Sequence, residues 1–170
     1  GQYDVVKITA NEYVAVESVS VANGNIYSKY SYDGALNSLS LETDDKDVYV
    51  EISKNGQNAS LKDIKEWDIL TVRKSFGEKP KLTRIEICDE KITDEAEEVN
   101  LSEKTVTLAG EEYTLSEALI HAMNHEGSKA RVPSVEEEYT YYFAANGKIA
   151  GVYGELTDSA RMGYLTKVGK

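Results

Sequence analysis

Three residues come closest to a metal or catalytic site by their types and spacing: Glu117, His121 and His125. They recur at every fourth position, so on a helix they would lie along one stripe. Two histidines one turn apart can share a zinc ion. The segment reads His-Ala-Met-Asn-His, however, and lacks the glutamate that follows the first histidine of a zinc-hydrolase helix. We therefore expect solvated side chains and no metal, and these three residues are the candidates if a metal binds.

Other catalytic arrangements find little support in the residue types. Asp44, Asp45 and Asp47 form an acidic loop, but the loop lacks the glycine and the bidentate glutamate of an EF-hand. A Ser-His-Asp arrangement would need one of the two histidines, and neither a Gly-x-Ser-x-Gly turn nor a phosphate-binding loop is present. Carboxylate pairs for glycoside hydrolysis stay open, because the fold sets their separation. We predict that the chain is not an enzyme and holds no cofactor.

Tyrosine is over-represented, with 12 copies against two phenylalanines and one tryptophan. A tyrosine ring suits a half-exposed strand face, because it joins an apolar body to a polar tip. Such rows either stack on sugar rings or pack against neighbouring strands. The tyrosines that would form a carbohydrate-binding platform are Tyr27, Tyr30, Tyr32, Tyr139 and Tyr141.

Composition excludes two classes of partner. The net charge of −11 opposes approach to a phosphate backbone, so we expect no nucleic-acid partner. No apolar stretch nears the roughly 18 residues of a membrane-spanning helix, so we expect no membrane insertion. Cys88 is the single cysteine, which excludes an internal disulfide and suggests a small buried apolar group.

A two-strand pattern recurs three times and predicts the organisation of the chain. Each copy has an alternating apolar strand, a polar break and a second such strand. The copies are 3–8 with 12–17, 67–72 with 82–87, and 139–143 with 148–153. They begin about 65 to 70 residues apart, the length of a small β domain.

Local signals place turns and helices between these strands. Val16 and Val19 have opposite parity, which predicts a β-bulge near Glu17 and Ser18. The Asn-Gly-Asn sequence at 23–25 predicts a tight turn.

Two helices are expected, each before a closing hairpin. Ser60 and Asp63 predict a short capped helical turn. Thr114 and Glu117 resemble a capping box for a longer helix at about 115–126, which has an apolar stripe at helical spacing.

The order of one unit is therefore strand, strand, helix and closing hairpin. This order predicts a mainly β chain with one or two short helices, arranged as tandem small OB/SH3-like β-barrel modules. We place the first barrel-like module, with a preceding hairpin, at residues 1–88. The second module, capped by the longer helix, is placed at residues 89–170.

The second unit also resembles a known group of modules. Residues 106–115, the following helix, the strand 139–143 and the hairpin segment 146–152 are similar to accessory β modules of clostridial (Firmicutes) cell-surface proteins that carry S-layer homology domains. The resemblance extends over about 67–168 and, more faintly, over 3–66. The resembling modules have a Gly-Asp pair before the closing hairpin. This chain has Trp67-Asp68 and Glu138-Tyr139 at those positions instead.

This resemblance implies a location and a role, and transfers no catalytic residue. The implied protein is secreted and lies at the cell surface or in the cell wall. The implied function is a non-catalytic structural or interaction segment, with cell-wall polymer or other modules of the same surface protein as partners. The alternative function is a carbohydrate- or cell-wall-polymer-binding module that uses exposed tyrosines.

Overall fold

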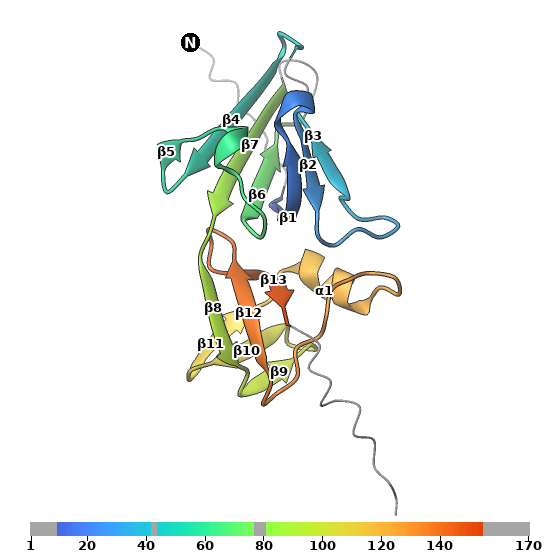
Figure 1. Ribbon diagram of the computed structural model, residues 1–170, viewed down its shortest axis with the longest axis vertical. Coiled ribbons are helices and arrows are strands. Elements are labelled where there is room, and N and C mark those ends of the chain that lie inside the picture. The colour runs from blue at the N-terminus through green and yellow to red at the C-terminus, as the bar shows by residue number, and fades with distance from the viewer. Residues whose placement is uncertain (1–9, 42–43, 77–80, 155–170) are drawn as a thin grey trace, which may run out of the picture.

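The computed structural model describes residues 10–41, 44–76 and 81–154 of the 170-residue chain (Figure 1). We call the described residues 10–88 the N-terminal half and residues 89–154 the C-terminal half. The predicted strand at 3–8 lies outside the described residues.

The N-terminal half forms one seven-stranded sheet with the strand order β3-β2-β1-β6-β7-β4-β5. Its elements are β1 (Glu12–Ser20), the 3-10 turn η1 (Val21–Asn23), β2 (Asn25–Ser28), β3 (Ser38–Ser40), β4 (Val48–Lys54), β5 (Gln57–Asn58), the 3-10 turn η2 (Leu61–Asp63), β6 (Ile69–Lys74) and β7 (Lys81–Cys88). The predicted hairpin of 67–72 with 82–87 is confirmed as the antiparallel pair β6 and β7.

The C-terminal half forms two three-stranded sheets, with the orders β11-β10-β9 and β13-β12-β8. Its elements are β8 (Lys91–Glu95), β9 (Glu98–Asn100), β10 (Thr105–Leu108), β11 (Glu111–Thr114), the helix α1 (Glu117–Asn124), β12 (Glu138–Phe143) and β13 (Ile149–Tyr153). The predicted closing hairpin is confirmed as the antiparallel pair β12 and β13. The prediction of a mainly β chain with short helices is thus confirmed.

The two halves share three features of their connectivity, although they differ in the number of strands and sheets. In each half the first strand pairs with the first strand of the closing hairpin, as β1 with β6 and β8 with β12. In each half a helical turn, η2 or α1, precedes that hairpin. The last strand also pairs in parallel with the segment before the helical turn. This pairing joins β7 to β4 in the N-terminal half, and a single bridge joins Ile149 to Leu115 in the C-terminal half.

The strand pairings of the described residues do not close either half into a barrel. In the N-terminal half the sheet ends at β3 and at β5, and β3 does not pair with β4. The long strand β1 instead pairs with a different strand along each part of its length. Residues 12–15 pair with β6 and residues 16–20 pair with β2.

Several local predictions are confirmed. The register of β1 against β2 shifts between Val16 and Ser18, where a bulge was expected. Gly24 adopts the left-handed conformation that its turn requires, with φ of 63°. Ser60 and Asp63 form a reciprocal capping box, in which the Ser60 N–H donates to the Asp63 carboxylate at 2.8 Å.

The expected start of the longer helix was wrong by two residues. Thr114 ends β11 as the partner of Thr105, so it is unavailable as a cap. Ser116 is the N-cap instead, and its Oγ accepts a hydrogen bond from the N–H of Leu119 at 3.2 Å. The helix ends at Asn124, because His125 already has an extended backbone with ψ of 123°.

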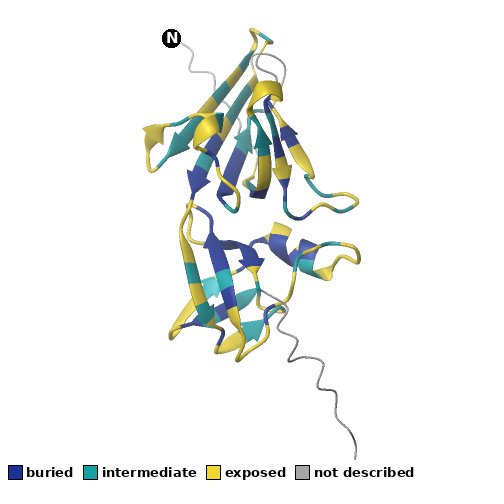
Figure 2. Cartoon of the chain, viewed as in Figure 1, coloured by how far each residue is buried: buried dark blue, intermediate teal, exposed yellow. Residues whose placement is uncertain are grey.

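The buried residues, drawn in dark blue in Figure 2, include two apolar clusters. The N-terminal cluster is purely aliphatic and consists of Val14, Val16, Ile26, Leu39, Leu41, Ile64, Leu70, Val72, Ile85 and Ile87. The other cluster is rich in aromatic residues and centres on the C-terminal half. It also includes Ala15, Tyr30 and Ile69 of the N-terminal half, so the second cluster crosses the junction between the halves. Cys88 is buried, as predicted.

Candidate functional site

The structure does not present the five predicted tyrosines as one exposed row. Tyr30 and Tyr139 are each only 8% exposed, and Tyr141 is fully buried. Tyr27 is exposed on β2, and Tyr32 is half-buried in the loop that follows. The prediction of an exposed platform built from these five rings is therefore wrong, because tertiary packing takes three of them into the core.

The three residues of the predicted helical stripe, Glu117, His121 and His125, do not come together as one site. Glu117 accepts a hydrogen bond from the Lys104 ammonium at 2.5 Å, and this contact lowers the pKa of its carboxyl group. His125 lies just past the helix, where its ring stacks on Tyr32 with centroids 4.5 Å apart. His121 remains exposed on α1. Among the described residues no group of three or more His, Cys, Asp or Glu side chains is arranged to hold a metal ion.

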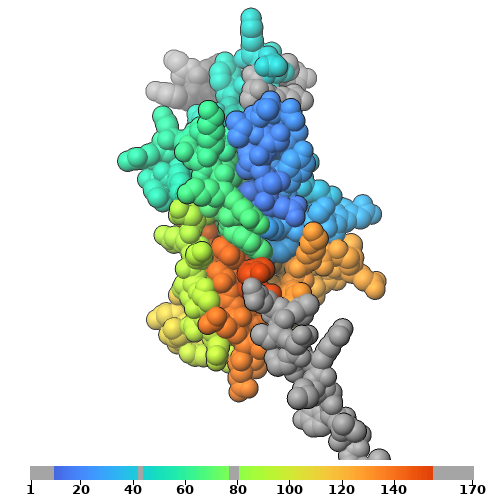
Figure 3. Space-filling view, viewed as in Figure 1, coloured from blue at the N-terminus to red at the C-terminus, as the bar shows by residue number. Residues whose placement is uncertain are grey.

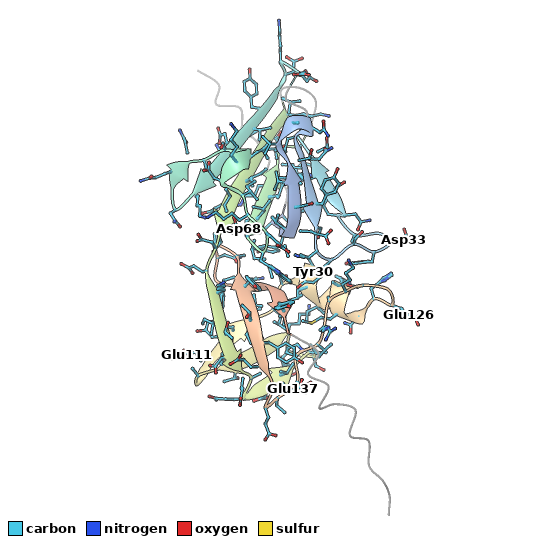
Figure 4. All side chains as sticks on the ribbon, viewed as in Figure 1. Tyr30, Asp33, Asp68, Glu111, Glu126 and Glu137 are labelled. Carbon is cyan, nitrogen blue, oxygen red and sulfur yellow. The ribbon has the colours of Figure 1, made fainter. Side chains whose placement is uncertain are left out.

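The best-defined arrangement of polar groups lies at the junction between the halves, at Tyr30 (Figure 4). The Tyr30 hydroxyl donates to the carbonyl oxygen of Val152 at 3.2 Å and accepts from the N–H of Val152 at 2.8 Å. Burial raises the pKa of this hydroxyl far above its ordinary value. A neutral hydroxyl can make both bonds at once, so Tyr30 acts as a hydrogen-bonded clip on the edge of β13.

Trp67 makes the second contact across the junction. Its ring stacks on Tyr142 of β12, with centroids 4.6 Å apart and an interplanar angle of 12°. Tyr153 packs at the side of the indole, and the Lys29 ammonium lies 4.8 Å from its centroid. Gly151 lies beneath it, and a Cβ there would lie 3.2 Å from Ile69 Cδ1 and 3.6 Å from the indole.

The backbone of Trp67 indicates that this contact is held in place by its surroundings. Its φ of 68° is uncommon for a bulky residue. Such a conformation costs roughly 1–3 kcal/mol and persists where packing over-determines it. The Trp67 N–H also donates to the carbonyl of Val16 at 2.8 Å. The turn that begins β6 is therefore fixed both to its own sheet and to the C-terminal half.

A cleft of about 520 Å³ lies beside these contacts, where the two halves meet. Tyr13 and Tyr32 line it from the N-terminal half, and Leu119 and Lys148 line it from the other half. The side-chain amide of Asn146 donates to the Tyr13 hydroxyl across the junction at 2.7 Å. The halves are in direct contact on the face shown in Figure 3.

Sequence reasoning did not identify Tyr13 or Trp67 as functional residues. Trp67 carried one usable signal, because the resemblance noted in the sequence led us to expect glycine at this position, and a left-handed backbone is what glycine permits. Tyr13 carried no such signal, since its partner Asn146 is 133 residues away in the chain.

Comparisons with known proteins assign no family. No protein-family model matches the chain, and no curated protein or solved structure is significantly similar to it. Among the helices of the described residues, none has the length and apolar character to cross a membrane.

Proposed function

We propose that this chain is a non-catalytic structural or interaction segment of a secreted bacterial cell-surface protein, built from two tandem modules fixed to each other. The observation that carries the proposal is the junction. Two aromatic side chains of the N-terminal half, Tyr30 and Trp67, are anchored on the closing hairpin of the C-terminal half. Since the second apolar cluster also continues across the junction, a hinge there would expose buried apolar surface.

The shared connectivity supports a module of the OB type. An OB barrel is a small, partly open five-stranded barrel, and a helix sits before its last two strands. Both halves have a long or divided first strand, a helical turn and a closing hairpin in that order. The parallel pairing of the last strand, β7 with β4, also fits this order.

A rigid pair of modules would act as a spacer or assembly element outside the cell, at the surface or in the wall. Its partners would be other modules of the same surface protein or a cell-wall polymer. The exposed surface is rich in carboxylates, and the net charge of −11 keeps such a segment soluble and apart from anionic polymers. We assign no cofactor and no catalytic step to it.

Residual dipolar couplings of the amide groups test the rigid junction. We expect the couplings of the two halves to fit one alignment tensor. Tyr30→Phe combined with Trp67→Ala should separate them into two tensors, and Tyr27→Phe, at an exposed ring on β2, is the matched control. Independent tensors in the unmodified chain would contradict the proposed role.

The location is tested separately. Intact cells that produce the parent protein are treated briefly with protease, and the released peptides are identified by mass spectrometry. We expect peptides of this segment without those of cytosolic marker proteins. Release only after lysis would place the segment inside the cell and overturn the proposed location.

A further inference from the structure

The outer face of the N-terminal sheet carries a row of polar residues that the junction does not use. Leu70 and Val72 of β6 point into the aliphatic core, so Thr71 and Arg73 point to the opposite face. On β7 the same alternation places Ile85 and Ile87 inward, so Arg84 points outward, as does Glu86.

Strand register brings two arginines together on this face. Arg73 and Arg84 are direct cross-strand partners in the β6–β7 pair. Like charges directly opposite each other destabilise a sheet. Glu51 lies beside Arg84 on β4 and pairs with its Nε at 2.7 Å, whereas Glu86 lies 3.9 Å from Arg73. The two carboxylates balance the two guanidinium groups in charge.

Both guanidinium groups retain unused donors. Arg73 uses its Nε in a 2.8 Å hydrogen bond to the side-chain oxygen of Asn11, and Arg84 uses its Nε on Glu51. Among the described residues, no acceptor lies within hydrogen-bond distance of the terminal nitrogens of either guanidinium. Each guanidinium group therefore presents a fork of N–H donors to the space above the sheet.

The hydroxyl group of Thr71 is a second feature of this face that points to a ligand. Thr71 is only 2% exposed, and its hydroxyl has no hydrogen-bond partner among the described residues. An unsatisfied buried hydroxyl is costly and rare in native structures. Thr71 pairs with Glu86 across β6 and β7 and lines the same hollow as the two arginines.

These side chains line a groove of about 560 Å³, a volume suited to a small ligand or a few sugar rings. Ser53 and Asn58, which are cross-strand partners, continue the polar lining onto β4 and β5. Tyr49 shares one face of β4 with Glu51 and Ser53, because the three residues are spaced two apart, and Tyr49 is 58% exposed. The groove thus has donors, acceptors and one exposed aromatic ring close to it on the same strand.

We propose that this groove binds a neutral saccharide chain. Hydroxyl groups of a sugar both donate and accept, so they can bridge the guanidinium forks and the carboxylates. The Thr71 hydroxyl, which is buried at the floor of the groove, can join them after a χ1 rotation of its side chain. An anion fits less well, because Glu51 and Glu86 share the groove and the chain carries a net charge of −11. This binding activity goes beyond the proposed structural role and does not depend on the junction.

The test is a pull-down of the full 170-residue chain on insoluble cellulose, chitin, xylan and polygalacturonate. We expect retention on at least one of the three neutral polymers, reversed by its soluble trisaccharide. Arg73→Lys and Arg84→Lys each keep the charge and remove the planar fork, so each should weaken binding about tenfold. Arg131→Lys, at an exposed arginine outside the groove, is the matched control and should bind normally.

Thr71→Val separates binding from folding. Removing an unpartnered hydroxyl should leave thermal stability unchanged or raise it, while the affinity for the saccharide falls. No retention on any neutral polymer overturns the proposal. Retention on polygalacturonate alone, lost in salt, also overturns it and assigns the groove to an anion. Retention unaffected by all three groove variants shows that binding occurs elsewhere and overturns it as well.

Discussion

The two halves of the chain share the order of first strand, helical turn and closing hairpin, but fill it with different side chains. The N-terminal half has a purely aliphatic core and a three-residue helical turn before its closing hairpin. The C-terminal half has an eight-residue helix there, and its closing hairpin buries Tyr139, Tyr141, Tyr142 and Phe143. The same connectivity therefore tolerates a small plug with branched aliphatic residues or a longer helix with aromatic ones.

The two kinds of core differ in how many buried hydroxyl groups need a hydrogen-bond partner. An aliphatic core hides no hydroxyl groups, whereas each buried tyrosine needs a partner for its oxygen. Tyr139 finds one in the Glu137 carboxylate at 2.8 Å, and Tyr30 finds one in the Val152 backbone. Tyr141 finds none among the described residues, and burial raises the pKa of its hydroxyl far above the ordinary value. Tyrosine hydroxyl groups therefore also make hydrogen bonds across the junction, from Tyr30 to Val152 and between Tyr13 and Asn146.

The largest effect should come from emptying either core. Ile85→Ala in the N-terminal half and Ile149→Ala in the C-terminal half each remove a fully buried side chain. Each should lower the free energy of unfolding by about 3 kcal/mol. Because the second cluster crosses the junction, calorimetry should show one transition in both variants. Two transitions, each moved by only one of the substitutions, would show that the halves unfold independently.

A glycine in the N-terminal half should give the next largest effect. Gly24 has φ of 63°, and a Cβ there would lie 2.7 Å from the backbone oxygen of Leu41. Gly24→Ala should cost roughly 2.5 kcal/mol, from the left-handed backbone and the displaced strand. Gly56→Ala is the control, because its φ is 75° but nothing lies within 4 Å of the added methyl. It should cost only about 1 kcal/mol. Urea unfolding measures the free energy of unfolding of both variants. Equal decreases for the two would argue against a steric clash between the Gly24→Ala methyl and Leu41.

A pair of identical substitutions sharpens the comparison of hydroxyl groups. Tyr30→Phe leaves the N–H and carbonyl of Val152 without their partner, so it should cost about 2 kcal/mol. Tyr141→Phe removes a hydroxyl without a hydrogen-bond partner among the described residues, so it should be neutral or stabilising. Thermal unfolding of both variants measures the difference. A destabilised Tyr141→Phe together with an unaffected Tyr30→Phe would reverse our assignment of the clip.

The smallest effect should be a change in pH dependence near η2. Burial raises the pKa of Asp68, so its contribution to stability is present at acid pH and is lost as the pH rises through the folded-state pKa. Asp68→Asn should therefore raise the melting temperature at pH 7, and the gain should vanish near pH 3. The new amide oxygen can still accept the bond from the Lys65 N–H.

Asp63 is the matched control with the opposite sign. Hydrogen bonds from Ser60 lower the pKa of Asp63, so its contribution is present at neutral pH and is lost as the pH falls. Asp63→Asn should lower the melting temperature at pH 7 and have no effect at acid pH. Parallel pH profiles for the two variants would contradict these assignments.

The sequence by itself determined much of the local structure of this protein, but not the start of α1. Alternating apolar residues predicted the closing hairpins, opposite parity predicted the bulge in β1, and Ser60 with Asp63 predicted a capped turn. Each of these depends on backbone torsions and on neighbours a few residues away. Local sequence is therefore sufficient to specify them, and the structure has all three.

Only the tertiary structure decided which residues meet. Tyr27 and Tyr139 both lie on strands, β2 and β12, yet one is exposed and the other is buried, because burial depends on what packs above the strand. The Tyr30 clip joins residues 122 positions apart. Arg73 faces Arg84 because of the β6–β7 register. Such contacts arise from long-range packing, which the spacing of residues along the chain does not encode.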